Sequence, residues 1–313
     1  MSSLRFVYHK DYNFNRGLPF VRQVHGFVLN KPGQIRAALV DQGVAKASQF
    51  ESPGRLQEDE LRAIHSEEVV SGWRSGKAIA AAGEFPPLAM LPSFISRHIL
   101  VKPQLRASAG TQLALAGAMQ GDWVFNLSGG FHHARKSLAH GFCLMNDVAW
   151  GVHCLHRAGH SPRVLVLDLD LHQGDGNVDA FEKRADVFTA SLHQGNTFPE
   201  PKLEGDLDLA LEGGEVDDDG YLRATDQLLA DIAARFDPEI VVYVAGTDPY
   251  RGDAIGDFNV SADALAERDR RVARFTLDHG AGLVVLPAGG YSAESPSISA
   301  AGYAAMAAEF RAN

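Results

Sequence analysis

Three carboxylates and one imidazole stand within eight residues of the chain, directly after an apolar run. The run Val164–Leu169 suits a strand that is buried on both faces of a parallel sheet. Alternate residues of a strand share a face, so Asp168, Asp170 and His172 begin with the parity needed to converge. A strand followed by a polar helix cap would need only one such aspartate. The pattern favours a divalent metal site with two oxygen donors, one nitrogen donor and open positions, as in catalytic sites.

A third ligand for such a metal is expected at Asp248, which follows another apolar run, Ile240–Ala245. Taken alone, an aspartate before Pro249 would be interpreted as a turn residue. The Gly-Thr pair that precedes it, and the Asp-x-His pair elsewhere in the chain, favour a ligand instead. Asp170, His172 and Asp248 are therefore the candidate metal ligands.

Two adjacent histidines, His132 and His133, follow a pair of glycines after the apolar run Trp123–Leu127. A single buried histidine is usually a core residue, whereas two in succession at a strand end more often transfer protons or bind metal. Imidazole titrates near neutral pH, which suits a general base for water and a general acid for a leaving amine. Asp168 and Asp175 remain as the acceptors that would fix the tautomer of each ring.

Aromatic residues near these loops have two interpretations each. Tyr291 follows two glycines and could donate a hydrogen bond to an oxyanion formed during amide hydrolysis, or simply pack in the core. Phe142 and Phe198 could wall a narrow apolar channel, or belong to the core. Cys143 is better interpreted as a small buried residue than as a nucleophile, because the metal cluster leaves a thiol no necessary role.

Strand-like apolar runs alternate with helical stretches through most of the chain. The expected strands are Leu4–His9, Trp123–Leu127, Val164–Leu169, Val187–Leu192, Ile240–Ala245 and Leu283–Pro287. The expected helices are Ile35–Gln42, Glu58–Gly76, Ala107–Gln120 with Ser108 as its cap, Leu144–Ala158, Asn177–Lys183, Tyr221–Phe236, Ala262–His279 and Ser295–Arg311. This alternation predicts a single α/β domain over residues 1–313, with helices on both faces of a central, mostly parallel sheet. Loops are expected at Gly17–Phe20 and Glu204–Gly220, and loop with short helix over Pro86–Pro103.

The composition is that of a globular protein, with 45% apolar and 22% charged residues. A net charge of −10 argues against nonspecific nucleic-acid binding. The two cysteines, Cys143 and Cys154, are too few for a disulfide framework and fit a reducing compartment. The N-terminus lacks a signal-peptide core, and no run reaches about 18 apolar residues, so we expect a cytoplasmic protein that does not contact membranes.

Six segments of the chain, occurring in order, together resemble the zinc-dependent histone deacetylase superfamily, which shares the arginase/deacetylase fold. They are Gly130–Ala134, Gly141–Cys143, Asp168–Gly176, Ser191–His193, Ala245–Asp248 and Pro287–Tyr291. The match runs through most of the chain. Gln173 after the metal histidine, together with the small size of the chain, is most like the class IV branch and its bacterial relatives.

The resemblance implies one Zn2+ ion per chain, held by Asp170, His172 and Asp248. It implies catalytic roles for His132, His133, Tyr291, Asp168 and Asp175. It also implies a potassium ion, K+, which the spacing alone would not suggest, at Asp168, Asp170, His172, Ser191 and Leu192. The acyl-lysine channel of the family would be flanked here by Gly141, Phe142 and Phe198.

We therefore expect a zinc-dependent amide hydrolase that removes acetyl or longer acyl groups from the lysine side chains of a peptide or protein. One alternative is hydrolysis of a small acylated amine such as an acetylpolyamine. A two-manganese ureohydrolase on the same fold would need more metal-binding carboxylates than these loops offer. A catalytically silent protein that binds acyl-lysine, or serves as a scaffold, is the alternative of a different class. The sequence predicts neither the oligomeric state nor the physiological substrate.

Overall fold

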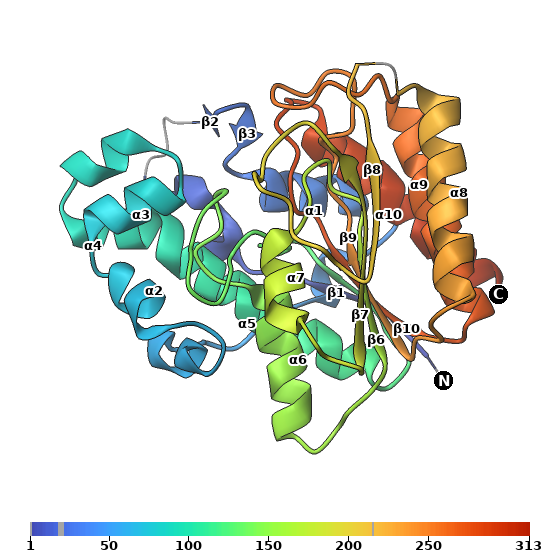
Figure 1. Ribbon diagram of the computed structural model, residues 1–313, viewed down its shortest axis with the longest axis horizontal. Helices are drawn as coiled ribbons and strands as arrows, with labels where there is room; N and C mark the ends of the chain where they lie inside the picture. The colour runs from blue at the N-terminus through green and yellow to red at the C-terminus, as the bar shows by residue number, and fades with distance from the viewer. Residues whose placement is uncertain (1, 18–21, 215) are drawn as a thin grey trace.

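The apolar runs of the sequence assemble into one parallel sheet. The structure, a computed structural model, describes residues 2–17, 22–214 and 216–313. Its main sheet has eight strands, all paired in parallel, in the order β4-β1-β5-β10-β9-β6-β7-β8 (Figure 1). In chain order these strands are β1 (Leu4–Val7), β4 (Phe50–Glu51), β5 (Trp123–Asn126), β6 (Val164–Asp168), β7 (Val187–Gln194), β8 (Leu207–Leu211), β9 (Ile240–Val244) and β10 (Gly282–Leu286). A short antiparallel hairpin joins β2 (Gln23–Val24) to β3 (Phe27–Val28).

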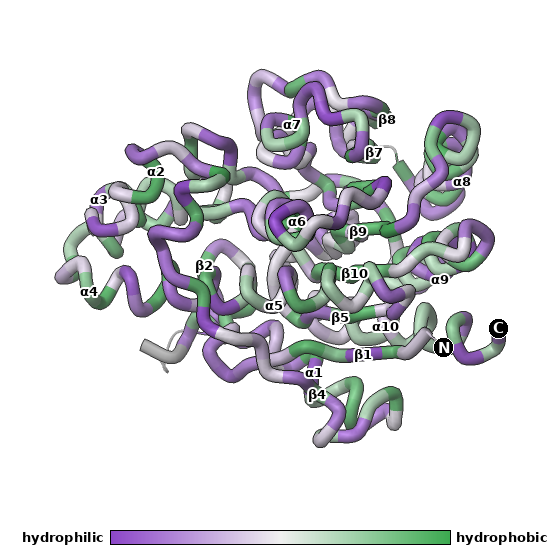
Figure 2. Tube along the Cα trace, turned by 90° about the horizontal axis from the view of Figure 1, so that it is seen from below, coloured by the Kyte–Doolittle hydropathy of each residue, from purple (hydrophilic) through white to green (hydrophobic). Residues whose placement is uncertain are grey.

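Helices cover both faces of this sheet, as Figure 2 shows for the strands β9, β10, β5 and β1. The α-helices are α1 (Lys31–Asp41), α2 (Glu67–Gly72), α3 (Gly76–Ala82), α4 (Ser93–Ser96), α5 (Lys102–Ala118), α6 (Asp147–Arg157), α7 (Asp175–Phe181), α8 (Asp218–Ala233), α9 (Ala262–Asp278) and α10 (Ser295–Ala312). On β6, Val164 and Val166 pack in the apolar cluster that includes α5 and α6, whereas Leu165 and Leu167 pack in the cluster with α1, α8, α9 and α10. The expected α/β fold class is confirmed, and the continuous apolar runs reflect burial on both sides.

Several expected element boundaries were wrong. Glu204–Gly220 is not a loop throughout, because β8 runs through it as an edge strand paired with β7. Leu207, Leu209 and Leu211 are half-buried while the residues between them are exposed, which is the alternation of a strand covered on one face. The strands β2, β3 and β4 have only two residues each and were not anticipated.

The expected helix Glu58–Gly76 is interrupted. A 3-10 helix at Glu58–Ala63 precedes α2, whose first turn is capped by the Ser66 hydroxyl. α5 begins at Lys102 rather than Ala107, because a proline in the first helical turn needs no N–H partner and does not break the helix. Ser108 is accordingly no cap.

Other boundaries moved less. α6 starts at Asp147, with the Asn146 side chain accepting from the Ala149 N–H. The segment Pro86–Pro103 contains short helical turns. Within it, α4 continues into α5 through a π turn at Arg97–Val101. The expected loop Gly17–Phe20 lies mostly outside the described residues. No helix in the described part of the chain has the length and apolar character needed to cross a bilayer.

The strand register brings the loops with polar residues to one edge of the sheet. Asp168 at the end of β6 lies opposite Val244 on β9, and Val244 lies opposite Leu286 on β10. The segments that follow these strands therefore leave the sheet side by side. Parallel α/β sheets bind ligands beyond the carboxyl ends of their strands, so this edge is where a site is expected.

Candidate metal centre and its catalytic loops

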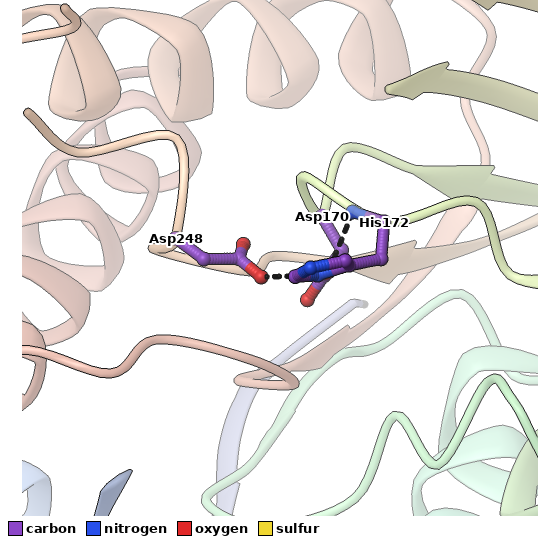
Figure 3. Close-up of side chains that lie close together, drawn as sticks. All are labelled: Asp170, His172 and Asp248. Carbon is purple, nitrogen blue, oxygen red and sulfur yellow. Dashed lines mark hydrogen bonds and ion pairs between the residues drawn. The ribbon is translucent and has the colours of Figure 1, made fainter. Parts of the chain in front are cut away.

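Asp170, His172 and Asp248 converge on one point, although Asp248 is 76 positions beyond His172. All three side chains are buried, and one ligand atom from each lies within 4.8 Å of the others. The His172 Nδ1 atom is 3.3 Å from an Asp170 carboxylate oxygen and 3.0 Å from an Asp248 oxygen. Figure 3 shows the three side chains pointing toward one another from the loops after β6 and β9.

Backbone N–H groups fix these carboxylates in place. The Asp170 carboxylate accepts from the N–H of His172 at 3.1 Å and from the N–H of Gly289 at 2.8 Å. The Asp248 carboxylate accepts from the N–H of Leu171 at 3.0 Å. Each carboxylate therefore ties one loop to another, and the three strand ends form one rigid unit.

The charges of this group fit a divalent cation. Burial and the neighbouring Asp170 raise the pKa of Asp248 to about 7, which marks a shortage of positive charge around two close carboxylates. Burial lowers the pKa of His172, but Asp170 and Asp248 outweigh that effect and raise it to about 10. A bound cation would supply the positive charge that the two carboxylates lack and that His172 otherwise gains by protonation. Two carboxylate oxygens and one imidazole nitrogen are also a donor set that zinc uses in hydrolytic sites.

The two adjacent histidines each have a carboxylate of their own. His132 Nδ1 lies 2.7 Å from Asp168 and His133 Nδ1 lies 2.9 Å from Asp175, with the two ring centroids 4.0 Å apart. Both rings are buried. These distances place each imidazole in the orientation that a hydrogen-bonded carboxylate imposes. The Nε2 atom of His132 then lies 3.7 Å from an Asp170 carboxylate oxygen.

The same two rings differ in their electrostatic surroundings. Burial lowers the pKa of His132, but Asp168 and Asp170 raise it more, to about 9. Burial and the adjacent His132 lower the pKa of His133 to about 3, because Asp175 alone does not compensate. Without a cation in place, His132 is therefore protonated at neutral pH and His133 is neutral.

Tyr291 lies beside this group with its ring buried. Its ring centroid is 6.5 Å from that of His172 and 5.6 Å from that of Phe142. Its backbone N–H donates to Asp253 at 2.6 Å. Burial and the nearby Asp170 hold the pKa of the phenol well above its usual value, so the hydroxyl keeps its proton.

Phe142 packs against Tyr291, whereas Phe198 packs against His133 and His172. The Phe198 ring centroid is 4.8 Å from that of His133 and 6.3 Å from that of His172. Gly141 has a positive φ of 56°, and a Cβ there would lie 2.6 Å from the His133 ring and 2.9 Å from Phe198. Only glycine allows this approach of the two rings.

A cavity of about 120 Å³ opens next to the same residues. Its lining includes His132, His133, Phe142 and Tyr291 but none of the three candidate metal ligands. The other lining residues are largely apolar and include Phe27, Phe85, Leu88, Ile99 and Leu100. Cys143 lines it as well and is buried, and burial raises the pKa of its thiol.

The residues of the expected K+ site are spread around the end of β6. Asp168 accepts from the Asp170 N–H at 3.1 Å, in addition to its contact with His132. The Ser191 hydroxyl is 2.9 Å from His193 Nδ1, and the Leu192 side chain packs in the core. A small cavity of about 10 Å³ is lined by residues that include Asp168 and Ser191.

Sequence reasoning missed four residues that support this site. Asp147 accepts from the N–H groups of Gly130 and Phe131 at 3.0 and 2.8 Å and so holds the loop before the histidine pair. His140 donates to the second oxygen of the Asp175 carboxylate at 2.9 Å. Lys31 and Arg268 are buried cations that bind backbone carbonyls of the site loops. Asp147 carried a recognisable signal, since it directly follows the asparagine that caps α6.

Comparisons with known proteins agree with this geometry. Residues 26–307 match the histone deacetylase domain. Histone deacetylase 2 of Arabidopsis thaliana is 29% identical over 301 residues, which cover 95% of this chain and 77% of that protein.

Two solved structures share the fold. An HDAC homologue complexed with SAHA has a TM-score of 0.72 at 25% identity, covering all of this chain and 84% of that one. The acetylpolyamine aminohydrolase of Burkholderia pseudomallei has a TM-score of 0.74 at 20% identity, covering 97% of this chain and 98% of that one. The chain belongs to the histone deacetylase family, and its sheet and helices are those of the arginase/deacetylase fold.

Proposed function

We propose that this protein is a zinc-dependent amide hydrolase that removes acyl groups from lysine side chains. The observation that carries the proposal is the buried Asp170–His172–Asp248 group beside two imidazoles, each held by its own carboxylate. Membership of the histone deacetylase family supports the same reaction class.

Asp170, His172 and Asp248 would hold the zinc ion. When bound, zinc would act as a Lewis acid on the acyl carbonyl and lower the pKa of the attacking water. The Asp–His–Asp set leaves coordination positions open for these two oxygens, as hydrolytic sites require.

The two imidazoles take different parts of the proton transfer in this proposal. His133 donates from Nδ1 to Asp175, so its Nε2 is left to accept the proton of the attacking water. The low pKa of His133 keeps that nitrogen unprotonated before the reaction. His132 pairs with Asp168 and would stabilise negative charge that forms next to it. The pair then returns a proton to the departing amine.

Tyr291 would donate its phenol hydrogen to the oxyanion of the tetrahedral intermediate. The raised pKa of the phenol keeps this hydrogen in place at neutral pH. Asp253 and the buried ring contacts orient the residue. Phe142 and Phe198 would flank the lysine side chain of the substrate.

The adjoining cavity supports acyl groups longer than acetyl. An engineered apolar cavity of about 150 Å³ takes up benzene. The cavity of about 120 Å³ beside Tyr291 is of similar size and lined mostly by apolar side chains, so it would receive a short aliphatic tail. We also propose a K+ ion at Asp168, Asp170, His172, Ser191 and Leu192, the positions that the family resemblance implies.

An acyl panel with metal control tests the function. Fluorogenic lysine peptides carrying acetyl, butyryl and octanoyl groups, together with an acetylpolyamine, would be assayed before and after chelation and after zinc is restored. We expect turnover of the peptides, with butyryl at least equal to acetyl, loss of activity on chelation and recovery with one zinc per chain. A higher kcat/KM on acetylpolyamine would assign the substrate to a small amine instead. Zinc binding without turnover of any member would contradict the enzyme assignment, and two manganese ions per chain would favour a ureohydrolase.

A further inference from the structure

We propose that Arg268 is a positioning residue of the metal centre, which sets the distance between the two loops that carry the ligands. The inference rests on the proposed zinc site at Asp170, His172 and Asp248. Arg268 itself lies in the middle of α9 and contacts those loops through their backbone carbonyls.

The guanidinium group of Arg268 bridges the two ligand loops through their backbones. Its Nη1 donates to the carbonyl oxygen of Gly246 at 2.8 Å and to that of Leu169 at 3.2 Å. Leu169 directly precedes the ligand Asp170, and Gly246 is two residues before the ligand Asp248. One nitrogen atom therefore contacts the segments that supply all three ligands.

The two carbonyl groups share this donor, and the Leu169 carbonyl also accepts from the Tyr221 hydroxyl at 3.4 Å. Both oxygens approach the same Nη1, so their partial negative charges would face each other if the guanidinium were absent. Arg268 is fully buried, and water has no evident access to replace it. We infer that loss of the donor lets the loops separate, and that the ligand oxygens separate with them.

The guanidinium is itself held by Asp269, although its Nη2 lies 2.8 Å from that carboxylate without making a hydrogen bond. Its Nε donates to Asp269 at 2.9 Å, and Asp269 also accepts from the Tyr243 hydroxyl on β9. The planar fork of arginine can make these contacts and the carbonyl contacts at once, which a lysine ammonium cannot. Asp269 thus orients the donor, while Nη1 reaches both ligand loops and also the Tyr221 hydroxyl at 3.4 Å.

Groups outside the ligand shell of a metal change its affinity by a known order of magnitude. Removal of such partners typically costs about 10- to 100-fold in metal affinity or activity. We expect zinc affinity to fall by about this factor when the Arg268 contacts are removed, with kcat falling more than KM changes, because the acyl-lysine channel is formed by other residues.

The test compares two variants that differ only at position 268. Asp269→Asn keeps both the arginine and an oxygen that can accept from Tyr243. Arg268→Met/Asp269→Asn removes the guanidinium without leaving a buried carboxylate unpaired. Zinc Kd would be measured by competition with a chelating dye, and the Tm of each zinc-free chain would report the fold. We expect a zinc Kd that is about 10- to 100-fold weaker for the double variant than for Asp269→Asn, which reports the loss of the carboxylate alone.

Arg268→Lys provides a second route, because it keeps the buried positive charge but lacks the fork. We expect weaker zinc binding for this variant as well, at a Tm near that of the wild-type protein. A folded Arg268 variant with wild-type zinc Kd would overturn the positioning role. Failure of the wild-type protein to bind zinc would instead remove the proposed function, so the two failures can be told apart.

Discussion

A methyl group at Gly289 would enter the proposed metal centre. A Cβ built on this residue lies 2.6 Å from an Asp170 oxygen and 2.6 Å from an Asp248 oxygen, whereas ordinary contact begins at 3.4 Å. Each oxygen must therefore retreat by the difference between 2.6 and 3.4 Å, about 0.8 Å. Metal–ligand distances tolerate only about 0.2 Å. Gly289→Ala should thus lower zinc affinity and kcat/KM by about 10²-fold or more, the upper end of what outer-shell changes cause.

The assay for Gly289→Ala combines zinc titration with steady-state kinetics on an acyl-lysine peptide. Gly54→Ala is the matched control, because a Cβ there meets nothing within 4 Å and no positive φ opposes it. We expect the control to keep wild-type affinity and rate. If Gly289→Ala also kept both, then Asp170 and Asp248 would not hold the ion through these oxygens, and the site as described would be wrong.

Three further predictions concern the phenol, the metal and a buried histidine. Tyr291→Phe should lower kcat by about 10²–10³-fold with little change in KM, as for loss of one oxyanion donor, and a full-rate variant would exclude the phenol from the reaction. Removing the metal should lower the Tm, because free zinc at about 1,000 times its Kd adds about 4 kcal/mol to the free energy of unfolding, and an unchanged Tm would contradict a site formed only in the folded chain. His65 donates to the Arg135 carbonyl at 3.0 Å and accepts from the Asn146 N–H at 3.0 Å, which requires the neutral ring. Burial lowers its pKa from 6.5 to about 4, so its stabilising effect is present above pH 6.5 and is lost as the pH falls toward 4. The loss is about 3 kcal/mol, and a pH series of urea unfolding should show a smaller slope in His65→Gln than in the wild-type protein.

The central strands were predictable because a strand that is buried on both faces has a continuously apolar sequence. Residues on both faces of β6 and β9 are buried, so their runs are continuously apolar. β8 is covered on one face only, and its alternating leucines lie within an acidic segment that composition alone assigns to a loop. The two-residue strands are defined by pairing with distant segments, which local patterns do not encode.

The convergence of the candidate metal ligands was predictable for a related reason. Each follows the end of a buried strand, and parallel strands bring such ends to one edge of the sheet. The chain therefore needs only the right residue types at those positions, and Asp170, His172 and Asp248 supply them. The partners of the histidine pair were also foreseen, since Asp168 and Asp175 were the carboxylates left over in the same stretch, and the structure brings them to His132 and His133.

The roles of the buried cations Lys31 and Arg268 were not predicted, because these side chains bind backbone carbonyl oxygens, which every residue has. Lys31 donates to the carbonyls of Pro287, Ala288 and Gly289 at 3.1, 3.2 and 2.6 Å, more than 250 positions further along the chain. No side chain of that loop is complementary to a lysine, so nothing in the local sequence pairs the two. Arg268 did carry a signal of its own, because it interrupts the apolar face of α9 between residues that are buried in the core. A charge on such a face must find partners inside the fold, and backbone carbonyls at the ends of neighbouring strands are the acceptors that a parallel sheet offers there.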